Sequence, residues 1–111
     1  MTVTIYHNPR CSKSRQTLAL LHDNDIEPDI IEYLETPPNS GELKSILGML
    51  NMGPRDILRA KEAKEEGIDG LDGDALIDAI VAHPRALQRP IVVTGGQARV
   101  GRPPESVLEI I

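Results

Sequence analysis

The first 33 residues change hydrophobic period twice, and this change limits the folds open to the chain. Residues 2–6 alternate polar and β-branched side chains, as in a short strand. A helix is predicted from about residue 11 to the turn at 23–25, and residues 29–33 again read as a strand. Two strands joined by a helix of this length lie parallel in one sheet. The chain therefore begins as an α/β protein.

The pattern of residues in the middle of the chain predicts helices. Asn39 and Glu42 have the spacing of a capping box, and a short helix is expected to begin at Gly53-Pro54 and to include Leu58. The charged run 61–66 is expected to be a solvated face. We place this helical insertion at about 37–84.

The last third returns to strands. Residues 91–94 and 97–101 are predicted strands, joined by a two-residue turn at Gly95-Gly96. A closing helix is expected after Pro104. The order is thus β-α-β, helices, then β-β-α, which predicts a mixed sheet and a single domain over residues 1–111.

Composition excludes several functional classes. The 111 residues carry a net charge of −5, which argues against a nucleic-acid binder. One cysteine allows no internal disulfide, as expected in a reducing compartment. We find no apolar signal segment and no run long enough to span a bilayer. The chain is therefore expected to be soluble and cytoplasmic, without a membrane partner.

Charge is unevenly distributed along the chain. All but two of the 17 acidic residues lie between Asp23 and Asp78. Residues 1–22 and 84–104 contain basic residues and no acid. We therefore predict that these two segments converge on a binding site for an anion.

The cysteine, Cys11, is placed where strand gives way to helix. Unpaired backbone N–H groups and the helix dipole at that position favour thiolate over thiol. His7, Arg10, Lys13 and Arg15 add positive charge nearby, so the sequence predicts a lowered pKa for Cys11. The alternative is that Cys11 is a small buried hydrophobe.

Four segments resemble those of the glutaredoxin-coupled arsenate reductases, the ArsC family. They are the cysteine loop 6–11, the arginine segment 57–62, the Arg-Pro strand 89–94 and the arginine segment 99–103. The Pro-Arg-Cys-Ser-Lys-Ser loop is similar to that of short bacterial members. The resemblance implies a thioredoxin-like fold and a role in arsenic detoxification.

The resemblance also implies a role for each matched residue. Cys11 would attack arsenate as a thiolate, which His7 would help to maintain and near which Ser14 would hydrogen-bond. Pro90 would be cis and would shape the site opposite the sulfur. Three arginines would bind and polarise the oxyanion: Arg59, Arg89 and Arg102. Guanidinium forks suit this task because they match a tetrahedral oxyanion.

The electron donors follow from the spacing and the family together. Cys11 and Ser14 form a Cys-x-x-Ser pattern, so a second, resolving cysteine is absent and an outside thiol is needed. The family implies glutathione as co-substrate and glutaredoxin as partner, with no bound metal or other cofactor.

Each assignment has an alternative. The three arginines are, without the family match, more simply solvated side chains, and only about 5–6% of bonds before proline are cis. A thiol-phosphatase of the Cys-x5-Arg type is rejected because Thr17 occupies the position at which that pattern requires arginine. Two other functions remain open: an Spx-like regulator that binds RNA polymerase, and a general glutathione-dependent oxidoreductase acting on protein mixed disulfides.

Overall fold

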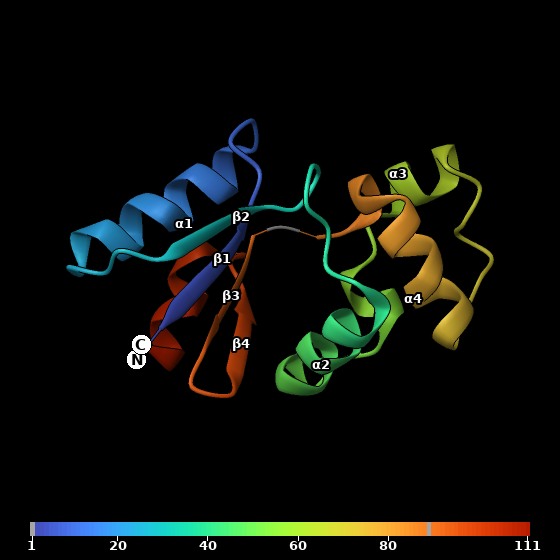
Figure 1. Cartoon of the computed structure of the whole chain (residues 1–111). Coiled ribbons are helices and arrows are strands. Elements are labelled where there is room, and N and C mark those ends of the chain that lie inside the picture. Colours follow the sequence, from blue (N-terminus) through green and yellow to red (C-terminus); the bar gives the residue numbers. More distant parts are fainter. Residues whose placement is uncertain (1, 89) are drawn as a thin grey trace. The chain divides into compact units, whose positions relative to one another are not determined.

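The computed structural model describes residues 2–88 and 90–111, which form two compact units (Figure 1). The sheet unit contains residues up to Thr36 together with those after Arg89. The helical unit spans Pro37–Gln88. Within the described part of the chain, no helix has the length and apolar character needed to cross a membrane.

The sheet unit is built on four strands in the order β2-β1-β3-β4. Their bounds are β1 Val3–His7, β2 Asp29–Glu32, β3 Ile91–Thr94 and β4 Gln97–Val100. Strand β1 runs parallel to β2 and antiparallel to β3, which in turn pairs antiparallel with β4. Gly95 and Gly96 have φ of 57° and 77° and close the tight β3–β4 hairpin, as predicted.

One face of this sheet is covered by helix α1 (Ser12–Asp23) and the 3-10 helix η3 (Pro104–Ile110). Leu21 of α1 and Val107 of η3 are buried against Ile5 and Val92 of the two central strands. The mixed α/β sheet expected from the sequence is therefore confirmed. Because α1 packs directly on β1, the turn between them is held at the carboxyl end of this central strand.

The helical unit contains α2 (Ser40–Leu50), η1 (Pro54–Ile57), α3 (Ala60–Glu65), α4 (Gly73–Ala82) and η2 (Pro84–Ala86). The capping box at the start of α2 is confirmed, since the Glu42 N–H donates to the Asn39 side chain and the Asn39 N–H donates to Glu42. Apolar side chains of α2 and α4 are buried and form the core of this unit.

Two expectations for this unit are wrong in part. Helix η1 ends at Ile57, and Leu58 instead forms an antiparallel bridge with Leu87. The charged run 61–66 is not simply solvated: the Glu62 side chain is ion-paired with Arg59 and only 15% exposed, and Ala63 is fully buried. The bridge fixes the backbone on either side of Leu58, including that of Arg59.

Candidate active site

The cysteine loop connects β1 to α1 through a tight turn. The Cys11 N–H donates to the Asn8 carbonyl at 3.0 Å, and the Arg10 N–H donates to the Asn8 side chain at 3.0 Å. Cys11 is the N-cap residue of α1, with extended backbone angles, and the first turn of the helix contains no acid. The half-buried sulfur therefore lies at the positive end of a twelve-residue helix.

His7 and Ser14 lie beneath this loop and are hydrogen-bonded to each other. The distance from His7 Nδ1 to Ser14 Oγ is 2.5 Å, and the Asn8 N–H donates to the same oxygen at 3.0 Å. Burial, aided by the charge of Arg15, lowers the pKa of His7, while Glu32 opposes this shift. The charged form of His7 is therefore disfavoured at pH 7, so His7 adds less positive charge beside Cys11 than its position in the sequence suggests. Its contact is with the Ser14 hydroxyl.

The lowered pKa of His7 predicts a dependence of stability on pH. At pH values below 6.5, the ordinary pKa of histidine, His7 binds a proton readily in the unfolded chain but not in the folded chain. The contribution of His7 to the free energy of unfolding is therefore complete above pH 6.5 and declines as the solution becomes more acidic. We expect His7→Gln to flatten the decline in the free energy of unfolding between pH 7 and pH 5, measured by urea unfolding. Ser12→Ala provides the control, because it changes an exposed hydroxyl that does not titrate in this range and should leave the decline unchanged. An unaltered slope in His7→Gln would contradict the prediction.

Arg102 reaches Cys11 from the opposite end of the sequence. Its Nη2 donates to the Cys11 sulfur at 3.8 Å, across 91 positions of the chain. Arg102 follows β4, and its own N–H donates to the Val100 carbonyl at 2.9 Å. The peptide bond between Arg102 and Pro103 is cis. A guanidinium and a helix N-terminus thus face one sulfur, an arrangement that favours thiolate and attracts an anion. Arg102 belongs to the second basic segment and Cys11 to the first, so this contact brings the two segments together as predicted.

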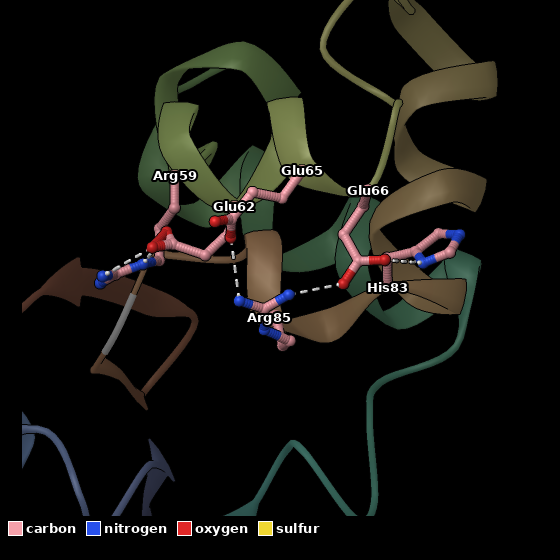
Figure 2. Close-up of polar contacts among 6 residues, drawn as sticks. All are labelled: Arg59, Glu62, Glu65, Glu66, His83 and Arg85. Atoms are coloured by element: carbon pink, nitrogen blue, oxygen red, sulfur yellow. Dashed lines mark hydrogen bonds and ion pairs between the residues drawn. The ribbon is translucent and has the colours of Figure 1, made fainter.

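The structure places the other predicted residues as follows. Arg59 belongs to the helical unit, where its Nε and Nη2 donate to the Glu62 carboxylate at 2.8 and 3.3 Å (Figure 2). Pro90 is buried immediately before β3. Arg89, and with it the peptide bond to Pro90, lies outside the described residues, so the cis bond at Pro90 stays a prediction. Arg85 of the second basic segment is paired with Glu65 and Glu66.

Two residues at these sites were not singled out from the sequence. Gly101 is buried where β4 meets α1 and Pro90, and its N–H donates to the Pro90 carbonyl at 2.9 Å. A glycine at a strand end is a signal of close backbone approach that was available in the sequence. Glu62 pairs with Arg59, and the spacing of three residues was the available signal for that contact.

A model of the ArsC family matches residues 6–110. This chain belongs to the ArsC family. It is 49% identical to the uncharacterized protein YfgD of Escherichia coli, over 98% of this chain and 96% of that protein. It is 46% identical to an arsenate reductase of Neisseria meningitidis, over 98% of this chain and 97% of that protein.

The solved structure of an arsenate reductase from Vibrio cholerae has a TM-score of 0.92 to this chain at 51% identity, covering 100% of this chain and 98% of that one. The thioredoxin-like fold of the ArsC family, expected from the cysteine loop and the strand order, is thereby confirmed. The four segments on which the resemblance was based, which are the cysteine loop, the two arginine segments and the Arg-Pro strand, all lie within the residues 6–110 that the family model matches.

Proposed function

We propose that this chain reduces arsenate to arsenite through a covalent adduct on Cys11. The observation that carries the proposal is the Arg102 guanidinium 3.8 Å from the Cys11 sulfur at the start of α1. Two negatively charged reactants, thiolate and arsenate, repel each other unless fixed positive groups offset that repulsion. The helix N-terminus and Arg102 supply such groups, and the relatives named arsenate reductases support the same substrate.

The reaction requires two thiols outside the chain. The Cys11 sulfur forms a bond to arsenic while an arsenic–oxygen bond breaks, and that oxygen leaves as water. A first glutathione thiol displaces a second arsenate oxygen as water. A glutaredoxin thiolate then attacks the glutathione sulfur, so two electrons pass to arsenic and a mixed disulfide of glutaredoxin and glutathione forms. Water breaks the bond between Cys11 and arsenic and releases arsenite, and a second glutathione reduces the mixed disulfide. The sum is that arsenate and two glutathiones give arsenite, glutathione disulfide and water. Because Cys11 is the single cysteine, the chain cannot supply the second thiol itself. With reduced glutathione as the reductant, the proposed location of the reaction is the cytoplasm.

The remaining roles follow from the site. Arg59, Arg89 and Arg102 would bind the oxyanion and its adducts, and a cis Pro90 would border the site. His7 would act through Ser14, whose buried hydroxyl it holds, to keep a hydrogen-bonding group near the sulfur. The scheme uses no bound metal or organic cofactor.

An assay that couples NADPH oxidation to arsenate, glutathione, glutaredoxin and glutathione reductase tests the proposal. We expect Arg102→Ala to lower kcat/KM for arsenate about 10- to 100-fold, since a hydrogen bond to a charged group contributes about 1.5–3 kcal/mol. Arg99→Ala is the matched control because Arg99, in the strand β4 that precedes Arg102, pairs with Glu109 instead. We expect Arg99→Ala to retain wild-type turnover.

Two results would overturn the proposal. The first is the absence of arsenate-dependent NADPH oxidation by the wild-type chain above the rate with glutaredoxin alone. The second is equal turnover in Arg102→Ala and wild type. Two other outcomes would identify the alternative functions. If Arg102→Ala still reduces a mixed disulfide between a protein and glutathione, the chain is a general thiol oxidoreductase. If the chain forms a stable complex with RNA polymerase and shows no turnover, it is a regulator.

A further inference from the structure

Arg59 is held at both its backbone and its side chain. Its N–H donates to the Ala86 carbonyl at 2.6 Å, beside the bridge between Leu58 and Leu87, and its own carbonyl accepts from the Ala63 N–H. Its guanidinium donates through two nitrogens to the single carboxylate of Glu62, as Figure 2 shows. A fork of this kind fixes the plane of the guanidinium as well as its position.

This pair is more shielded from water than other ion pairs of the chain. The Arg59 and Glu62 side chains are 22% and 15% exposed. By comparison, both partners are about half exposed or more in the pairs of Arg85 with Glu65 and of Lys44 with Asp74. Shielding strengthens the interaction, because water screens it less. Glu62 therefore has a strong influence on where the Arg59 guanidinium points.

Glu62 has two opposing effects on an oxyanion bound by Arg59. Its negative charge reduces the attraction of the guanidinium for an anion. Its carboxylate, by binding two nitrogens of the guanidinium, removes in advance the conformational freedom that a long arginine side chain otherwise loses on binding an anion. The two effects predict opposite outcomes when the charge of Glu62 is removed.

We propose that Glu62 is a positioning residue for Arg59, and that orientation outweighs the loss of positive charge. This inference rests on the proposed function, in which Arg59 contacts the oxyanion. Glu62 itself touches no substrate. It fixes the plane of the guanidinium before a tetrahedral oxyanion binds to it.

The test compares Glu62→Gln, Arg59→Ala and the double variant in the coupled assay. We expect Glu62→Gln to lower kcat/KM for arsenate about 3- to 30-fold, mainly through a higher KM, with little change in the KM for glutathione. In the Arg59→Ala background the same change should have no further effect on the KM for arsenate, because the proposed influence of Glu62 on the oxyanion passes through that arginine. Glu65→Gln is the matched control on the same helix, where Glu65 pairs with Arg85, and we expect it to behave as wild type.

Binding of inorganic phosphate, a tetrahedral oxyanion that is not reduced, supplies a second measurement by titration calorimetry. We expect the Kd for phosphate to rise in Glu62→Gln by the same factor as the KM for arsenate. An unchanged or lower Kd and KM would overturn the proposal, because the charge effect would then dominate. Equal losses from Glu62→Gln with and without Arg59 would also overturn it, since they indicate a structural role.

The two proposals fail in different ways. If the wild-type chain binds phosphate more tightly than Glu62→Gln but does not reduce arsenate, the redox function is wrong and the positioning role stands. If arsenate is reduced but Glu62→Gln matches wild type in both measurements, only the positioning role is wrong. A wild-type chain that neither reduces arsenate nor binds phosphate contradicts both.

Discussion

Replacing Cys11 with serine is expected to abolish arsenate-dependent turnover, with a loss on the order of 10³-fold or more. A serine hydroxyl is neutral at pH 7, whereas the thiol is at a helix N-terminus with Arg102 beside it, and these groups favour the anionic nucleophile. The chain contains no second cysteine to substitute for the first. The measurement is NADPH oxidation in the coupled assay.

The control must separate lost chemistry from lost structure. Ser12→Ala changes the adjacent, exposed hydroxyl and should retain turnover, and circular dichroism should show the same helical signal in all three chains. Iodoacetamide should label the wild-type chain once at pH 7 and leave Cys11→Ser unlabelled. Residual turnover in Cys11→Ser above the rate with glutaredoxin alone would place the chemistry elsewhere.

Replacing Gly101 with alanine is expected to destabilise the sheet unit by about 1–3 kcal/mol and to lower turnover as well. An alanine Cβ at this position would lie 2.5 Å from Thr17 Oγ1 and 2.8 Å from Pro90 Cγ. The backbone cannot move away easily, because the Gly101 N–H donates to the Pro90 carbonyl. The added methyl group would therefore separate α1 from the segment that carries Arg102, and the guanidinium would move relative to Cys11.

Urea unfolding and the coupled assay together measure this effect. Gly48→Ala is the matched control, because a Cβ at Gly48 on α2 meets nothing within 4 Å and a helical alanine should stabilise the chain slightly. Adding Thr17→Ala to Gly101→Ala removes the closest contact and should restore part of the lost stability. An unfolding free energy equal to that of wild type in Gly101→Ala would refute the close packing described here.

The local structure of this chain was largely predictable. Alternation of residue type located the first strand, the capping box located the start of α2, and two consecutive glycines located the hairpin. These features are encoded by neighbouring residues, so they can be recognised without knowing the tertiary fold. The end of η1 was misplaced because Leu58 pairs with Leu87, a contact 29 positions away that no local pattern reveals.

The sequence by itself determined the strand-to-helix position of Cys11, the order of the elements and the candidate site residues, the last through a family resemblance. Only the tertiary structure decided that Arg102 meets the sulfur, that burial disfavours the charged form of His7, which is bonded to Ser14, and that Gly101 must lack a side chain. The reason is that a strand or a helix depends on residues a few positions apart. The ionisation of a buried group and the reach of an arginine depend on segments that the sheet brings together from opposite ends of the chain.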